Sequence, residues 1–222
     1  MRKLRVFISG QKYFAKEVFR LCQSIEGVEI VGVCTPVGDK YLGSIASTFG
    51  IDIIPAGSLN ADTMPEGVDL GITAHSFDFI GRKTRYKTRL GWIGYHPSLL
   101  PKHRGRSAIE WALRMRDDIT GGSVFWLNGG IDRGDIAYQD WCFIDPKYYL
   151  MRPKEAARRL WENDLQPIGL RLMRQAVSEI KAGIIKKTPQ DERFSTFEPN
   201  TDVKDVYKPD LLMIERYGSP ST

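Results

Sequence analysis

A strand, a glycine turn, a helix and a second strand follow one another at the start of the chain, and this order limits the fold more than any other feature. Residues 4–9 form an apolar run, rich in β-branched and aromatic side chains, that stops at Gly10. The apolar residues of the next stretch recur at helical spacing, at Phe14, Val18, Leu21 and Ile25. Residues 28–35 are again largely apolar, which is typical of a parallel strand covered on both faces. The chain is therefore expected to open with a βαβ unit.

Strands and helices keep alternating along the rest of the chain. Further strands are expected at residues 51–54, 69–74, 92–95, 123–127 and 136–143, and helices at 44–49, 80–88 and 107–115. Residues 153–182 carry one long amphipathic pattern, which Pro167 should kink or split. This order predicts an α/β fold, namely a Rossmann-like, open and mostly parallel sheet with helices on both faces.

A change in composition near Lys187 marks the end of the predicted domain. The later chain is polar and is interrupted by Pro189, Pro199 and Pro209. The length of 222 residues slightly exceeds the usual size of one domain. We therefore expect a catalytic domain over residues 1–187, and a C-terminal extension over residues 188–222 that wraps over it and is not an independent domain.

The charge balance and the cysteines narrow the class of protein. Lys and Arg number 32 against 27 acidic residues, and the net charge of +5 favours anionic partners without specifying one. Cys22, Cys34 and Cys142 stand far apart among apolar residues, so we expect buried free thiols and neither a disulfide nor a metal site. The apolar stretch at the start of the chain is too short for a signal or membrane segment. These features predict a cytoplasmic protein without a membrane partner.

Two polar residues follow predicted strands, and parallel sheets bind ligands beyond the carboxyl ends of their strands. His96 directly follows the strand at 92–95, and Asp132 follows the strand at 123–127 in the glycine-rich sequence LNGGIDRGDI. A histidine can donate or accept a proton near neutral pH, and a carboxylate can orient it. Taken singly, each residue also has a structural explanation. His96 would bond a backbone carbonyl, and Asp132 would cap a hairpin turn, with Asp135 as its competitor.

The sequence around these two residues resembles a known family. The run YHPSLLPKHRGRSAIEWAL, which contains His96, is followed by GGIDRGDI with Asp132, and together they resemble the formyltetrahydrofolate-dependent transferase and hydrolase superfamily. GQKYFAKEVF near the start and SFDFI at 76–80 are most similar to the hydrolase domain of 10-formyltetrahydrofolate dehydrogenases. The resemblance covers about residues 1–190.

The resemblance implies a role for both residues and raises a question about Gly94. In similar proteins a His and an Asp manage protons while a nucleophile attacks the formyl carbon of 10-formyltetrahydrofolate, and they correspond to His96 and Asp132. His96 would either donate to the developing oxyanion or take the amine's proton through a water. The transferases carry an Asn two positions before the His, where this chain has Gly94. Because one lost oxyanion donor costs about a hundredfold or more in rate, Gly94 puts amine transfer in doubt.

The resemblance also implies which residues contact the two substrates. Those assigned to the folate are Phe79, Ile80, Arg82, Asn128, Gly129 and Gly130. Those assigned to the acceptor, or to replacing the missing donor, are Gln11, Ser76, His103 and Arg104. Phe79 and Ile80 would otherwise belong to the core, whereas His103 and Arg104 would otherwise be solvent-facing or structural.

Three kinds of function remain open. The first is formyl transfer from 10-formyltetrahydrofolate to an amine of a small acceptor, such as an amino sugar or amino nucleotide. The second is hydrolysis of 10-formyltetrahydrofolate to formate, and the third is folate binding without turnover. A methionyl-tRNA acceptor is possible but not favoured, because only about 30 residues follow the core where tRNA formyltransferases carry a separate domain. The phosphate loop of glycinamide ribonucleotide formyltransferases is absent from ISGQKYF.

Overall fold

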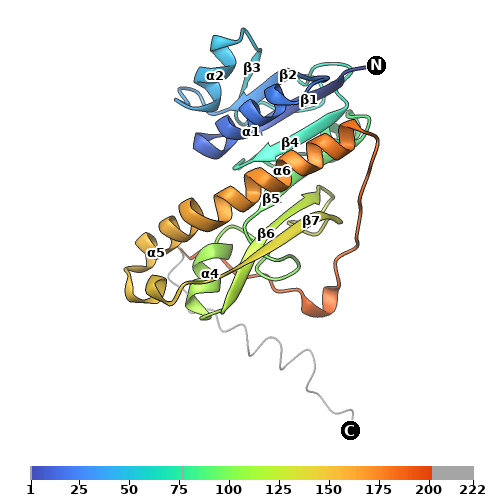
Figure 1. The fold of residues 1–222 in the computed structure, drawn as a ribbon. Coiled ribbons are helices and arrows are strands. Elements are labelled where there is room, and N and C mark those ends of the chain that lie inside the picture. Colours follow the sequence, from blue (N-terminus) through green and yellow to red (C-terminus); the bar gives the residue numbers. More distant parts are fainter. Residues whose placement is uncertain (1, 77, 202–222) are drawn as a thin grey trace.

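The structure, a computed structural model, describes residues 2–76 and 78–201. Within them, seven strands form one sheet in the order β3-β2-β1-β4-β5-β6-β7 (Figure 1). The strands are β1 (Leu4–Gly10), β2 (Val28–Thr35), β3 (Ile53–Pro55), β4 (Leu70–Ala74), β5 (Gly91–His96), β6 (Ile119–Trp126) and β7 (Ile136–Phe143). The helices are α1 (Lys12–Ser24), α2 (Leu42–Thr48), α3 (Arg82–Tyr86), α4 (Ala108–Arg114), α5 (Pro153–Leu160) and α6 (Gln166–Lys181), with 3₁₀ turns η1 (Pro146–Leu150) and η3 (Glu192–Phe194). The predicted α/β class is confirmed.

The sheet is parallel over its first five strands and antiparallel beyond them. β1 pairs in parallel with β2 and β4, β2 with β3, and β4 with β5. β6 runs antiparallel to both β5 and β7. Trp126, the last residue of β6, consequently pairs with Ile93 near the start of β5. A parallel β6 would carry the loop that follows it, and Asp132 with it, to the same edge of the sheet as His96. Because β6 is antiparallel to β5, that reason for expecting Asp132 at this edge is wrong.

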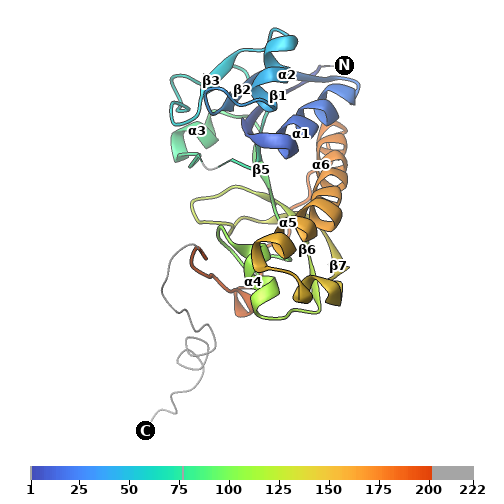
Figure 2. The same ribbon diagram turned by 90° about the vertical axis from the view of Figure 1, so that its left-hand side faces the viewer.

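Helices cover both faces of the sheet, with α1 and α6 on one side and α3 on the other (Figure 2). Alternate residues of β1 divide between these faces: Val6 and Ile8 pack in the cluster that contains α1 and α6, whereas Phe7 packs with Trp92 on the opposite face. Burying each side chain of this size contributes about 1.5–3 kcal/mol. A Cβ at Gly71 would lie 2.0 Å from the Trp92 ring, so only glycine leaves room for it.

The long helical pattern at 153–182 is broken, as Pro167 predicts. α5 ends at Leu160, a π-helical turn η2 covers Trp161–Leu165, and α6 begins at Gln166 with the proline in its first turn. A proline there removes the N–H that a continuous helix would pair with the preceding turn. Trp161 in the π-helical turn contacts the rings of Phe14 and Tyr95. The break thus holds an aromatic side chain against the sheet.

The first part of the predicted extension lies against the domain. Thr188 exchanges two backbone hydrogen bonds with Ile136 at the start of β7, and Phe197 forms a backbone bridge with Arg104. Residues 202–222 of the expected extension, and Phe77 of the SFDFI segment, lie outside the described residues. The described extension therefore reaches the loops that follow β5 and β6.

The cysteines are free thiols, of which Cys22 and Cys34 are buried and Cys142 is half-buried. Burial raises the pKa of the Cys22 thiol to about 12, and burial together with the neighbouring Asp78 raises that of Cys34 to about 12. Neither is a reactive thiolate at neutral pH. Among the described residues, no helix has the length and apolar character needed to cross a membrane, and no three or more His, Cys, Asp or Glu side chains are grouped to hold a metal ion.

Candidate active site

His96 is the last residue of β5 and is only 6% exposed. It shares a face of the sheet with Gly94 and Trp92, because alternate residues of a strand point the same way. The loop that follows is fastened to β6 by one hydroxyl, since Ser123 donates to the carbonyl of Ser98 at 2.6 Å and accepts from the N–H of Leu100 at 3.1 Å. His96 is therefore held between a rigid strand and an anchored loop.

Asp132 meets His96 across the site. Its Oδ2 lies 3.6 Å from His96 Nδ1 and accepts a hydrogen bond from the backbone N–H of Gly105 at 2.8 Å. Because β6 ends beside the start of β5, the loop must run back along β5 to reach His96. Asp132 adopts a positive φ of 52°, a conformation that Asp tolerates better than most residues. Asp135 instead lies at the base of the hairpin, where its carbonyl accepts from the N–H of Trp126.

The hydrogen bonds of His96 assign a task to each ring nitrogen. Nε2 lies 2.7 Å from the carbonyl oxygen of His103, which can only accept, so Nε2 carries a proton. In the neutral ring Nδ1 then has the free lone pair, and it faces the carboxylate of Asp132. His96 thus makes the backbone hydrogen bond expected of a structural histidine through one nitrogen, while its other nitrogen faces Asp132.

His103 is buried, and its ring bridges two carboxylates. Nε2 lies 2.8 Å from Asp117 and Nδ1 lies 3.1 Å from Glu198, while the side chain is 2% exposed. Burial by itself lowers the pKa of His103, but the hydrogen bonds and charges of Asp117 and Glu198 outweigh it and raise the pKa above its ordinary value. The ring therefore anchors its own backbone, whose carbonyl holds His96. This placement favours the structural role of His103 over the expected acceptor contact.

Arg104 is also 2% exposed and is engaged within the chain. Its guanidinium donates to both carboxylate oxygens of Glu192, at 2.7 and 2.9 Å, and to the side-chain oxygen of Gln190. A buried guanidinium with these partners is not placed to meet a small acceptor. The expected acceptor role of Arg104 is therefore not supported by its position, and the residue fastens the extension to the loop after β5.

The raised pKa of His103 predicts a pH dependence of stability. A group whose pKa is raised in the folded state contributes stability fully below its ordinary value, about 6.5, and loses it as the pH rises through the higher folded value. We expect the free energy of unfolding, measured by urea titration, to fall as the pH rises above about 6.5. In His103→Gln the same profile should be flatter. Parallel profiles for the two proteins would contradict a raised pKa of His103.

The residues assigned to the folate differ in exposure. Phe79 is 74% exposed, so it is no part of the core, and Arg82 is exposed with its guanidinium 5.5 Å from the Tyr86 ring. The side chain of Ile80 is 4% exposed and packs with Phe7 and Trp92. A side-chain contact between Ile80 and a folate is therefore not supported, whereas Phe79 and Arg82 remain accessible.

The loop after β6 presents backbone rather than side chains. Asn128 uses its Oδ1 to accept the N–H of Gly130 at 2.8 Å, which folds the loop on itself, and Gly129 and Gly130 are exposed. Gly129 faces Arg85, whose guanidinium donates to the carbonyl of Ile80 and lies 4.0 Å from the position of a Cβ on Gly129. Arg85 thus lies beside both segments expected to hold the folate. Nothing in the sequence of the helix predicted for residues 80–88 indicated this position of Arg85.

Gln11 and Ser76 lie at the carboxyl ends of β1 and β4, which are paired. The N–H of Gln11 donates to the carbonyl of Ala74, and Ser76 shares a hydrogen bond with Ser9 at 3.0 Å. The sheet order changes direction between these strands, so this is the topological switch point at which open sheets bind ligands. His75, which precedes Ser76, has a φ of 55° here, and burial together with the charge of Lys12 lowers its pKa.

Gly94 faces a hydroxyl of the neighbouring strand. Thr73 on β4 pairs with Gly94, and a Cβ at position 94 would lie 2.4 Å from Thr73 Oγ1 and 3.1 Å from Leu127. Thr73 therefore occupies the space that a side chain at position 94 needs. A larger residue there requires a change at position 73 as well.

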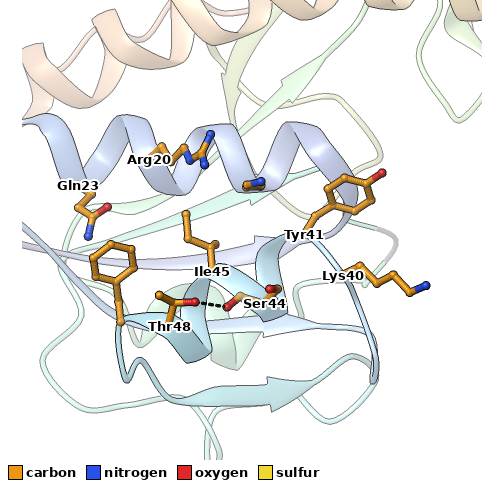
Figure 3. Close-up of a pocket in the computed structure, with 9 residues that line it drawn as sticks. Arg20, Gln23, Lys40, Tyr41, Ser44, Ile45 and Thr48 are labelled. Atoms are coloured by element: carbon orange, nitrogen blue, oxygen red, sulfur yellow. Dashed lines mark hydrogen bonds between the residues drawn. The ribbon is translucent and has the colours of Figure 1, made fainter.

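A separate groove of about 310 Å³ lies between α1 and α2 (Figure 3). It is lined by Lys16, Arg20 and hydroxyls of α2, with Tyr41 and Phe49 also at its wall. Arg20 is paired with Glu17, and the lining includes neither His96 nor Asp132. The groove is therefore distinct from the candidate active site.

The fold and the site define a class of protein: an α/β domain in which a buried His and a half-buried Asp face each other near the carboxyl edge of its parallel strands. Residues 58–162 match the family model described as formyl transferase. The matched part of the chain, which contains both His96 and Asp132, is similar to the formyl transferase family.

Relatives are similar to this chain in sequence, and solved structures are similar to it in fold. Cytosolic 10-formyltetrahydrofolate dehydrogenase from Mus musculus is 34% identical over 211 residues, which cover 88% of this chain and 22% of the relative. The chain thus spans about a fifth of the length of that relative. A methionyl-tRNA formyltransferase from Methylacidiphilum infernorum is 36% identical, over 49% of this chain and 31% of the relative. An N-formyltransferase from Helicobacter canadensis, solved with folinic acid and dTDP-3-aminofucose, has a TM-score of 0.70 and 18% identity, over 92% and 73% of the two chains. At that identity it shows the shared fold alone.

Proposed function

We propose that the chain transfers the formyl group of 10-formyltetrahydrofolate to an amine of a small acceptor, such as an amino sugar or amino nucleotide. The observation that carries this proposal is the His96–Asp132 pair, whose Nδ1 and Oδ2 are 3.6 Å apart while Nε2–H is bound to a carbonyl. A free nitrogen beside a carboxylate is the arrangement that a nucleophile needs when it must lose a proton during attack.

The reaction uses this pair in two steps. The amine nitrogen bonds to the formyl carbon while its proton passes to Nδ1 of His96, and Asp132 stabilises the imidazolium that forms. The bond between the formyl carbon and N10 of the folate then breaks, and His96 returns the proton to N10. The tetrahedral intermediate between these steps carries an oxyanion that positioned N–H groups stabilise.

The residues assigned to the folate are chemically suited to one. An exposed aromatic ring at Phe79, exposed backbone at Gly129 and Gly130, and cations at Arg82 and Arg85 suit a flat heterocycle with an anionic tail. We infer that the pterin lies against the loop after β6 and that Arg82 meets the glutamate tail. The small amine acceptor is supported by the fold shared with an enzyme solved with dTDP-3-aminofucose. Cytoplasmic location stays a prediction.

A second candidate function is hydrolysis of 10-formyltetrahydrofolate, in which water replaces the amine. It is favoured by Gly94, which supplies no side-chain donor, and by the 34% identity to a 10-formyltetrahydrofolate dehydrogenase. Transfer to methionyl-tRNA is less favoured, since the related tRNA enzyme matches only 49% of this chain. Incubating the pure protein with 10-formyltetrahydrofolate alone and with candidate amines separates these possibilities. Rapid formate release without an amine would refute strict transfer, whereas tight folate binding with no turnover in any mixture would favour a binding protein.

Substitution at position 94 tests whether this residue decides if the formyl group passes to an amine or to water. Because Thr73 Oγ1 fills the space beside Gly94, we expect Gly94→Asn alone to destabilise the protein by about 1–3 kcal/mol. Removing the hydroxyl in Thr73→Ala/Gly94→Asn should relieve the contact and raise the ratio of amine transfer to hydrolysis at least about tenfold, since an added oxyanion donor is worth that much or more. Thr73→Ala is the matched control. An unchanged product ratio in the folded double variant would show that position 94 does not select the acceptor.

A further inference from the structure

The two loops that carry His96 and Asp132 come from different parts of the sheet. Residues 97–107 follow β5, whereas residues 127–135 form the hairpin loop between β6 and β7. Since β6 runs against β5, strand pairing alone does not place Asp132 beside His96. The pair therefore depends on contacts that tie one loop to the other.

Gln190, in the extension after α6, makes such a contact on both sides. Its Nε2 donates to the carbonyls of Asp132 at 2.8 Å and Gly134 at 2.7 Å. Its Oε1 accepts from the guanidinium of Arg104 at 2.7 and 3.1 Å. A side-chain amide has two N–H donors and two acceptor lone pairs, so all four are used here. One side chain thus holds the carbonyl of the catalytic Asp and the buried Arg next to His103.

The same segment of the extension fixes the His96 side of the site. Thr196 accepts the N–H of His103 at 2.8 Å through its hydroxyl and the N–H of Arg104 through its carbonyl. The carbonyl of His103 in turn accepts from Nε2 of His96. His103 and Asp132 both have positive φ, of 57° and 52°, conformations that cost free energy unless their surroundings hold them. The extension supplies contacts that stabilise both.

We propose that Gln190 is a positioning residue that sets the distance and orientation between His96 and Asp132. This inference rests on the proposed function of the pair. A displacement of about 1 Å in a reacting group costs on the order of 100-fold in rate, so the loss of this amide should act mainly on kcat.

The test compares Gln190→Met, which keeps the length of the side chain but none of its hydrogen bonds, with the wild-type full chain. With 10-formyltetrahydrofolate as substrate, we expect kcat to fall about 10- to 100-fold, with a much smaller change in KM. Gln190→Glu keeps acceptors for Arg104 but presents a carboxylate oxygen to two carbonyls, and should lose as much. Gln175→Met removes an exposed amide from α6 and is the matched control, expected to keep wild-type kcat.

A second readout does not depend on activity. The N–H of Gly105 donates to the Asp132 carboxylate, so its hydrogen exchange reports on the junction of the two loops. We expect exchange at Gly105 to become at least tenfold faster in Gln190→Met, while exchange in β1 stays unchanged. If Gln190→Met does not fold, Gln190→Asn, which retains an amide one methylene shorter, takes its place in both measurements.

The two hypotheses fail separately. Wild-type kcat in the folded Gln190 variants, in an assay where His96→Ala is inactive, overturns the positioning role and leaves the proposed function intact. If the wild type turns over no 10-formyltetrahydrofolate with any acceptor, the proposed function fails. Gly105 exchange then decides whether Gln190 holds the two loops together, and unchanged exchange overturns the proposal.

Discussion

Replacing His96 by alanine is expected to lower kcat for 10-formyltetrahydrofolate turnover by about 10²–10⁴-fold, the range of lost general acid–base catalysis. The physical reason is that Nδ1 is the ring nitrogen left free beside Asp132, while Nε2 is committed to the carbonyl of His103. Binding of folinic acid, measured by calorimetry, should change little, because the inferred folate contacts lie at Phe79, Arg82 and the loop after β6. Single-turnover kinetics with and without an amine measures the loss.

His96→Gln separates chemistry from structure in this experiment. The amide of glutamine can still donate to the carbonyl of His103, so the loop after β5 should keep its anchor, but glutamine has no nitrogen that takes up a proton. We expect this variant to be as inactive as His96→Ala and more stable, by about 1 kcal/mol for the retained hydrogen bond. Substantial activity in His96→Gln would reduce His96 to a structural histidine and refute its proposed role.

Replacing Asp132 by asparagine is expected to lower kcat by about 10²-fold or more, because a neutral amide no longer stabilises the imidazolium that forms when Nδ1 of His96 takes up the proton. The amide oxygen can still accept the N–H of Gly105, so the loop should keep its fold, but the charge facing Nδ1 of His96 is lost. Steady-state kinetics across pH gives the readout, with unfolding by urea as the check on stability.

The neighbouring acid provides the matched control for this variant. Asp135→Asn lies three residues along the same loop and leaves the backbone carbonyl that accepts from Trp126 unchanged, so it is expected to retain most of the activity. Equal losses in the two variants would mean that the loop is merely sensitive to any substitution. Loss confined to Asp135→Asn would move the proposed role to that residue.

Much of the fold was predictable because it depends on local patterns. Continuous apolar runs and helical spacing identify the strands and helices, and Pro167 predicts the break that the π-helical turn now accounts for. The apolar pattern did not reveal that β6 is antiparallel to β5, because parallel and antiparallel strands can have the same apolar sequence. Asp132 was nonetheless correctly expected beside His96, but its loop reaches that position by folding back and not by the direction of β6.

Burial of charged residues was the part of the site that the sequence predicted least. His103 and Arg104 belong to a motif rich in cations and were assigned to an acceptor, yet each is 2% exposed. Their partners Glu198, Glu192 and Gln190 lie more than 80 residues away along the chain. No local period or spacing links residues so far apart, so only the folded chain pairs them.

The sequence by itself determined the α/β architecture and nominated His96, Asp132 and Gly94, because strand and loop chemistry is local. The tertiary structure alone decided which nitrogen of His96 is free, since that depends on the carbonyl of His103 reaching Nε2. It also decided that Thr73 occupies the space beside Gly94 and that Gln190 ties the two loops together. These are distances between strands and loops that meet only when the sheet is complete.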